Sequence, residues 1–419
     1  MAEQSVVASK TRELYKTLCQ TEWSAPVTGL LIGFFSVLIM AWWRPWGIVG
    51  ALRNWGDWCM YGLGSLLHSE SGVFQYYSDA PKSILVDSGS VIGLCFILGA
   101  FISACLGKEF ALRVPPYREM VKAVLAGILM GIGAGLSGGC NIGGFYNAIG
   151  NLAANGFTMM IGLIFGVILG LKLLYWEMEH ISWGDGGAKT IAPPAAFLPW
   201  LGLIALVLLV VAAYRYAGAK ADYTASLCGV VLFAAALGYS MQRGRWCMMQ
   251  SFREPHMTGD CTMAKSVMLS ICVVALGAAV LKYQVPMRAD GASVLDASNY
   301  VRGTFGWGSI VGGFIFGLGG MFAGGCGSGT LWRVGEGQVK LMIVVPFFAI
   351  TNSIFVAWLQ DNEFEANGYL GSKVYLPAVH FHGWTLGYGG ALLLIGLIMA
   401  LWYVVVTWNE ETNKLVVPM

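Results

Sequence analysis

The sequence predicts an all-α protein that crosses a membrane about ten times, in two inverted, pseudo-symmetric repeats. Composition is the first observation: 57% of the 419 residues are hydrophobic and only 11% are charged, against roughly 25% charged residues in soluble proteins. The second is a series of apolar stretches that approach or reach the ~20 residues needed to span a bilayer, most clearly at 197–214 and 388–406. The third is an internal match between the two halves of the chain.

The expected spans begin after a polar N-terminal segment. Residues 1–25 contain no apolar core of the kind found in signal peptides, so we expect them to remain in the cytoplasm. Ten helical spans are expected to follow. They lie near 26–43, 88–106, 121–138, 156–175, 197–214, 226–242, 264–281, 304–325, 341–358 and 386–407.

The number of spans and the basic residues together predict the orientation. Ten spans place both termini on one side of the membrane, and lysine and arginine favour short cytoplasmic loops. With the N-terminus inside, the predicted cytoplasmic segments hold fifteen lysines and arginines, and the opposite side holds nine. We therefore expect both termini to be cytoplasmic.

Two short internal matches indicate a duplication. A shift of 186 residues lays residues 126–144 on 312–330, and seven of these nineteen positions are identical. The identical pairs include Gly139 with Gly325 and Cys140 with Cys326.

The second match has nearly the same offset. A shift of 188 residues lays 53–60 on 241–248 and pairs Cys59 with Cys247. Five predicted spans separate equivalent points, so the second copy enters the membrane from the opposite side. Transporters built from such inverted repeats bind their substrate near the midplane, between the repeats. A count that differed by one span would make the repeats parallel.

These matches give the expected domain organisation. Its parts are a cytoplasmic N-terminal segment (1–25), a first membrane repeat (26–180), a connecting loop and linking span (181–221), a second membrane repeat (222–360), an extracytoplasmic loop (361–385), and a C-terminal span and tail (386–419).

Glycine-rich runs surround the repeated cysteines at 131–145 and 317–331. Irregular backbone at membrane depth is tolerated where it is buried in protein or lines a wet cavity, and the N–H groups that begin a new helix attract anions. The sequence therefore predicts two re-entrant loops around Cys140 and Cys326. Small residues also allow close helix packing, which is the interpretation we favour for the glycines farther from the thiols. These are Gly127, Gly131, Gly313 and Gly317.

Four cysteines belong to the repeated motifs. Inversion would place Cys59 towards the outside, Cys247 towards the inside, and Cys140 and Cys326 nearer the centre. A neutral thiol is a weak donor on a polarizable atom, and conduction needs binding weak enough to allow release. The pattern suits an anion with a soft sulfur or selenium atom.

Polar residues close to these thiols are further candidates for the path. Asn141 follows Cys140 and can donate its amide to an oxyanion. Arg253 and Arg333 follow Cys247 and Cys326 near a predicted cytoplasmic mouth, where guidance of an anion and a loop ion pair are both open interpretations.

Longer stretches resemble a known family. Residues 243–266 and 311–339 resemble the second-half signatures of the YeeE/YedE family of bacterial inner-membrane proteins, and 134–150 resembles its first-half loop. The resemblance implies an hourglass of two halves, uptake of thiosulfate in the inner membrane, and a relay made of Cys59, Cys140 and Cys326 with Cys247 as the inner counterpart. The length and the extra C-terminal span are closer to the longer, YedE-like branch, which is associated with selenium, so the solute stays open between thiosulfate and a selenium species.

The remaining expectations concern cofactors, partners and rival functions. The sequence has no Walker loop, Cys-X-X-Cys or dinucleotide fingerprint, and His380 and His382 are weak evidence for a metal, so we expect no cofactor and no metal. The expected partners are the small anion, the lipid bilayer and a possible cytoplasmic sulfur or selenium carrier protein, without nucleic acid. We expect a transporter, not an enzyme. The rivals are a membrane sulfurtransferase that carries a persulfide and a passive channel with structural cysteines.

Overall fold

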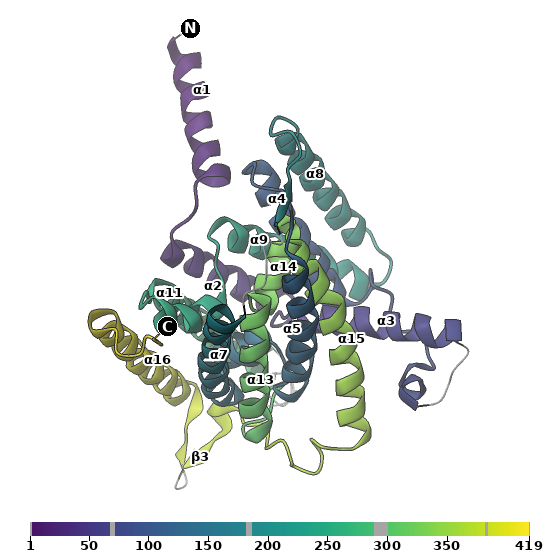
Figure 1. The fold of residues 1–419 in the computed structure, drawn as a ribbon, viewed down its shortest axis with the longest axis vertical. Helices are drawn as coiled ribbons and strands as arrows, with labels where there is room; N and C mark the ends of the chain where they lie inside the picture. The colour runs from purple at the N-terminus through teal and green to yellow at the C-terminus, as the bar shows by residue number, and fades with distance from the viewer. Residues whose placement is uncertain (1, 68–71, 182–186, 289–300, 382–383, 419) are drawn as a thin grey trace.

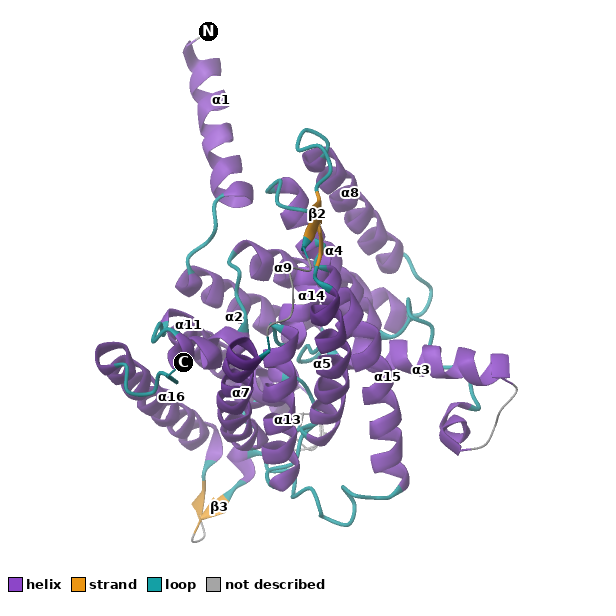
Figure 2. Ribbon diagram, viewed as in Figure 1, coloured by secondary structure: helices purple, strands orange, loops and turns teal. Residues whose placement is uncertain are grey.

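The computed structural model describes residues 2–67, 72–181, 187–288, 301–381 and 384–418. Helices dominate these residues, and their strands form two short antiparallel pairs (Figure 2). Within this part of the chain, ten helices are long and apolar enough to cross a membrane. The prediction of an all-α membrane protein with ten spans is therefore confirmed, and the protein is a multi-pass membrane protein.

The first half of the chain contains five of the ten candidate spans. Its helices are α1 (Ala2–Tyr15), η1 (Lys16–Gln20), α2 (Ala25–Trp42), α3 (Val49–Leu67), η2 (Gly72–Tyr77), α4 (Ser88–Leu106), α5 (Tyr117–Leu136), η3 (Asn141–Tyr146), α6 (Asn147–Gly150), α7 (Asn155–His180) and α8 (Leu198–Ala217).

The second half continues with shorter helices between long ones. Its helices are α9 (Asp222–Arg243), which begins the second predicted repeat, α10 (Met248–Met257), α11 (Thr262–Arg288), α13 (Trp307–Ala323), α14 (Gly327–Glu336), α15 (Val339–Asp361), η4 (Leu376–Ala378) and α16 (Gly387–Thr412). The antiparallel strand pairs are β1 (Leu112–Val114) with β2 (Lys189–Ile191) and β3 (His380–Phe381) with β4 (Trp384–Thr385). The sequence did not predict α3, α10 or α14 as separate helices.

The most extensive helix contacts join the two halves of the chain. Helix α4 packs on α9 and α2 packs on α11, while α13 packs on α7 and α15 packs on α5. Helices α5, α7, α13 and α15 run alongside one another in the middle of the molecule (Figure 1). Helix α1 and the β3–β4 hairpin lie at opposite ends of the view in Figure 1.

Glycine makes these crossings close. A Cβ added to Gly99 of α4 would lie 1.9 Å from the carbonyl oxygen of Ala235, and one added to Gly238 of α9 would lie 1.9 Å from that of Phe96. Neither position therefore has room for a side chain. The packing role expected for four further glycines is confirmed, because each added Cβ would come within 3.0 Å of a neighbouring helix. These are Gly127, Gly131, Gly313 and Gly317.

Candidate functional site

Two helices of the central group are broken next to a cysteine. Helix α5 ends at Leu136 and α13 ends at Ala323. Gly138 (φ 70°) and Gly324 (φ 83°) follow in left-handed conformations, which glycine adopts without the steric cost of a Cβ. A new helical segment, η3 or α14, then begins after the cysteine in each case.

Cys140 and Cys326 begin these new helical segments with almost the same backbone conformation. Cys140 precedes η3 with φ −79° and ψ −173°, and Cys326 precedes α14 with φ −75° and ψ −178°. Both thiols are 0% exposed. The repeated sequence therefore folds into a repeated local structure, in which each thiol stands at the N-terminal end of a helical segment.

Three of the four predicted thiols lie at one place in the protein. The Sγ atoms of Cys247 and Cys326 are 3.7 Å apart. Gly327 adjoins Cys140, since a Cβ added to Gly327 would lie 3.0 Å from the Cβ and 3.2 Å from the Sγ of Cys140. Cys140, Cys326 and Cys247 are thus buried near one another, and we call this group the thiol row; Gly327, the residue after Cys326, is the one that adjoins Cys140.

Cys59 has a different position. It lies well inside α3 and is exposed, whereas Cys247 directly precedes α10 and is 1% exposed. The two cysteines that the sequence match paired therefore do not occupy equivalent points of their helices. Trp46 and Trp246 do correspond, because each stands just before a helix, α3 or α10, and donates from Nε1 to a serine Oγ at 2.8 Å.

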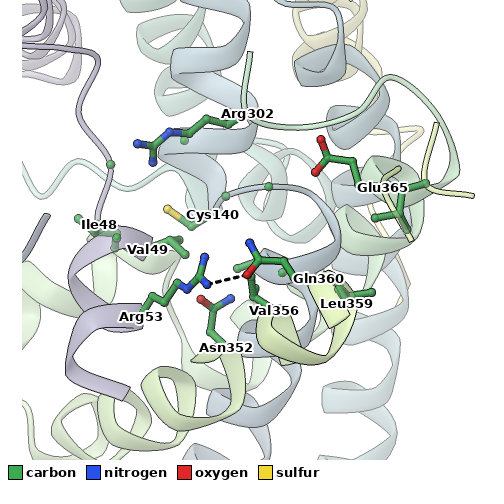
Figure 3. A pocket seen from close by; sticks show the side chains of 18 of the residues that line it. Ile48, Val49, Arg53, Cys140, Arg302, Asn352, Val356, Leu359, Gln360 and Glu365 are labelled. Atoms are coloured by element: carbon green, nitrogen blue, oxygen red, sulfur yellow. Dashed lines mark hydrogen bonds between the residues drawn. The ribbon is translucent and has the colours of Figure 1, made fainter. Parts of the chain in front are cut away.

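A cavity of about 710 Å³ opens beside Cys140. Arg53 of α3, Arg302 and Asn352 of α15 line it together with Cys140, and Figure 3 draws Cys140 between the two arginines. The Nη2 of Arg53 donates to Oε1 of Gln360 at 3.1 Å. Two cationic side chains in a low-dielectric recess attract anions.

Carboxylates at the rim of this cavity are Glu363 and Glu365. Glu365 pairs with Lys373 at 2.5 Å, which compensates its charge. Arg53 and Arg302 are therefore the cationic side chains that line the cavity together with Cys140.

A second cavity, of about 670 Å³, contains Arg253. It lies between the ends of α5, α7, α10 and α13, and Lys122 and Lys340 also line it. Lys122 contacts Glu119 at 2.5 Å and Glu177 at 3.0 Å, and the guanidinium of Arg253 lies 3.7 Å from Glu254. Both open interpretations of Arg253 have support here, since it lines a cavity and has a nearby carboxylate.

The side-chain amide of Asn141 is buried, and its hydrogen-bonding groups are unsatisfied within the described residues. It is 0% exposed, and in the part of the chain that the structure describes neither its Nδ2 nor its Oδ1 has a hydrogen-bond partner. A buried polar group without a partner costs about 1–3 kcal/mol. An amide beside Cys140 that is left unsatisfied is a suitable group for a polar solute to bind.

The other predicted residues hold the breaks in shape. The backbone of Gly139 accepts from Ser137 Oγ at 2.8 Å, and the N–H of Gly325 donates to the carbonyl of Gly320 at 3.1 Å. Arg333 donates to the carbonyl of Gly324 and lies over the ring of Trp332 at 4.9 Å. In this structure Arg333 therefore anchors the loop before Cys326.

An ion-pair network lies close to the segments of the thiol row. Glu336, the last residue of α14, is 1% exposed and accepts from Arg113 and Arg245 at 3.1 Å each. Arg245 also contacts Glu109 at 3.2 Å, and so does the buried Arg243. The network joins α14, which carries Cys326, to the turn that carries Cys247. The sequence prediction did not include it.

Arg53 is the second feature that the sequence prediction omitted, although a signal for it exists. Tryptophan is followed seven positions later by arginine at Trp46 and Arg53, and again at Trp246 and Arg253. The offset between these pairs is 200 residues and not 188. Each arginine lines one of the two cavities.

The described residues include no group of three or more His, Cys, Asp or Glu side chains that could hold a metal ion. His382, part of the weak His-X-His signal, lies outside them.

Comparison with known proteins gives two results. A model of the Sulphur transport family matches residues 1–169 and 243–418. The chain is also similar to the "Probable transporter YedE" of Escherichia coli (strain K12), with 24% identity over 391 residues that cover 89% of each protein.

Further relatives have related names. The "Probable transporter YedE" of Salmonella typhimurium (strain LT2) is 25% identical over 335 residues, which cover 75% of this chain and 76% of the relative. The "Thiosulfate transporter TsuA" of Escherichia coli (strain K12) is 33% identical over 125 residues, which cover 30% of this chain and 32% of the relative.

Proposed function

Because this chain belongs to the Sulphur transport family, with the resemblance to YeeE/YedE proteins confirmed, we propose that it imports a small sulfur- or selenium-containing anion across the bacterial inner membrane. The thiol row carries the proposal. Cys140 lines the arginine-lined cavity, Cys326 and Cys247 face each other, and Gly327, next to Cys326, presents no side chain to Cys140.

The proposed path begins in the first cavity. Arg53 and Arg302 draw the anion in, and Cys140 and the unsatisfied amide of Asn141 replace part of its hydration shell. The anion then passes Gly327 to Cys326 and Cys247 and leaves by the cavity that holds Arg253. Thiols suit this passage because they are weak donors, so that no single contact holds the anion long enough to stop it.

The proposal includes the orientation. The first cavity faces outwards, the second faces the cytoplasm, and both termini are cytoplasmic, as the basic residues indicate. The packing of α4 on α9 and of α2 on α11 supports a pseudo-symmetric repeat. The odd number of candidate spans, five, that precede the span beginning with α9 supports its inversion. The relay role of Cys59 stays a prediction, since this residue is exposed on α3.

Uptake of labelled thiosulfate, with selenite in parallel, tests the proposal in cells that lack other importers. We expect Cys140→Ser and Cys326→Ser each to lower uptake by about tenfold or more, because a serine hydroxyl is a stronger donor than a thiol and lacks the polarizable sulfur. An anion held more tightly by about 1.4 kcal/mol at one point of the path leaves it about tenfold more slowly. The label that wild type prefers identifies the solute. Cys272→Ser, on the half-buried cysteine of α11, is the matched control and should take up the label normally.

Other outcomes of this assay have definite meanings. Normal uptake in both variants, with the protein present in the membrane, would contradict the proposal and would show that the cysteines serve only to pack the structure. Cys59→Ser measured alongside them tests the outermost member of the predicted relay.

Arg53→Gln tests the entrance. We expect uptake at low substrate concentration to fall by about tenfold, because the variant loses a cation near the entering anion, while the maximal rate changes less. Arg53→Lys should keep most of the uptake, and Arg12→Gln on the exposed helix α1 should match wild type. Equal apparent KM values for Arg53→Gln and wild type would remove Arg53 from the path.

A further inference from the structure

Cys247 and Cys326 differ from every other part of the proposed path because two thiols face each other there. Their Sγ atoms are 3.7 Å apart, and a disulfide requires about 2.05 Å. Each sulfur would have to move by about 0.8 Å, which a small change in side-chain torsion provides. The residues precede separate helices, Cys247 before α10 and Cys326 before α14, so a bond between them would link the starts of these two helices covalently.

The surroundings leave this contact open. Gly329 faces both sulfurs, and a Cβ added to it would lie 2.8 Å from Cys247 Sγ and 3.3 Å from Cys326 Sγ. The backbone N–H of Gly329 donates to Cys326 Sγ at 3.2 Å. The thiolate is the form that reacts, and the N–H of Gly329 is placed to hydrogen-bond a thiolate at Cys326 once one has formed.

The corresponding place in the first half contains one thiol only. Cys140 stands where Cys326 stands, but Gly47 follows Trp46 where Cys247 follows Trp246. A bond of this kind can therefore form in one half of the protein and not in the other.

We infer that Cys247 and Cys326 form a modification site in which a small two-electron oxidant makes a reversible disulfide that closes the path. With an azo oxidant such as diamide, both S–H bonds break and one S–S bond forms. The oxidant takes up the two protons and two electrons and becomes a hydrazine. Dithiothreitol restores the two thiols by exchange. The closing effect, unlike the bond itself, rests on the proposed function.

The bond is tested on purified full-length protein. The protein is treated with diamide, its remaining thiols are alkylated, and its peptides are analysed by mass spectrometry. We expect a linked peptide pair that contains Cys247 and Cys326 and disappears after dithiothreitol. Alkylation of both cysteines after diamide, or a link of either to another cysteine, would overturn the inference.

A variant that keeps both thiols controls for geometry. Gly329→Ala should slow formation of the link by about tenfold or more, because its methyl group occupies the space beside the two sulfurs. Gly396→Ala, where an added Cβ meets nothing within 4 Å, should form the link at the wild-type rate. Unchanged link formation in Gly329→Ala would show that the sulfurs meet in an arrangement other than the one described.

Uptake into membrane vesicles completes the test. Diamide should lower uptake by wild type by about tenfold, and dithiothreitol should restore it. A link that forms without changing uptake would refute the closing effect. If wild type takes up neither label although the link forms, the proposed function fails and the modification site stands. If wild type takes up the label normally and no link forms, the modification site fails and the proposed function stands.

Discussion

Replacing Gly327 by alanine is expected to stop uptake while the protein remains folded in the membrane. The new Cβ would lie 2.9 Å from Cδ1 of Ile48 and 3.0 Å from Cβ of Cys140, inside normal contact distance. It would fill the space between Cys140 and Cys326 through which the anion is proposed to pass. Since the nearest atom is the end of a flexible side chain, the fold can adjust, but only by moving Ile48 and Cys140 within the path.

Labelled uptake and the amount of protein in the membrane should be measured together. We expect at least about a tenfold loss of uptake, with protein levels close to wild type. Gly396→Ala tests the same chemical change at an open position of α16. Uptake at the wild-type level in Gly327→Ala would place the path elsewhere and would leave the thiol row without its proposed role.

Replacing Glu336 by glutamine is expected to have the largest effect on stability. Glu336 is 1% exposed and holds two guanidinium groups, each at 3.1 Å. Removing one partner of a buried ion pair typically costs about 3–5 kcal/mol. We expect about 3 kcal/mol here, because Arg113 and Arg245 are each 39% exposed and water can solvate them in part.

The free energy of unfolding in detergent, obtained from denaturant titration, is the appropriate measurement. Glu13→Gln is the matched control, since Glu13 pairs with Lys10 at 2.8 Å but the two side chains are 65% and 74% exposed. An exposed pair contributes about 0–1 kcal/mol, so this variant should unfold like wild type. Equal stabilities of the two variants would mean that the network does not fix the position of α14.

Hydrophobicity was sufficient to predict the ten spans, because lipid requires long apolar helices wherever the chain crosses it. It could not predict α10 and α14, which have ten residues each and are too short to give a span signal. Helix α3 was not predicted for another reason. It has 19 residues, but Arg53, Asn54 and Asp57 interrupt its apolar residues.

The candidate site was predictable where the sequence repeats and obscure where it does not. Glycine and cysteine recur at 138–140 and 324–326 because the backbone needs the same left-handed turn in both places. The match that paired Cys59 with Cys247 followed identical letters. The correspondence of Trp46 with Trp246 rests on the serine hydroxyl to which each ring N–H donates. These contacts join residues that are not neighbours in the sequence, so an alignment of the two halves does not reveal them.

The exchange of helices between the halves also governs how this protein must be made. When the ribosome has released α2, α4, α5 and α7, the helices on which they pack most extensively, α11, α9, α15 and α13, have not yet been synthesised. Until then the helices of the first half expose their glycine-lined faces to lipid. Assembly is therefore completed late, after most of the chain has been inserted. Truncated chains that end before α9 would consequently lack these partner helices and present the quality-control proteases of the cell with an unfinished core.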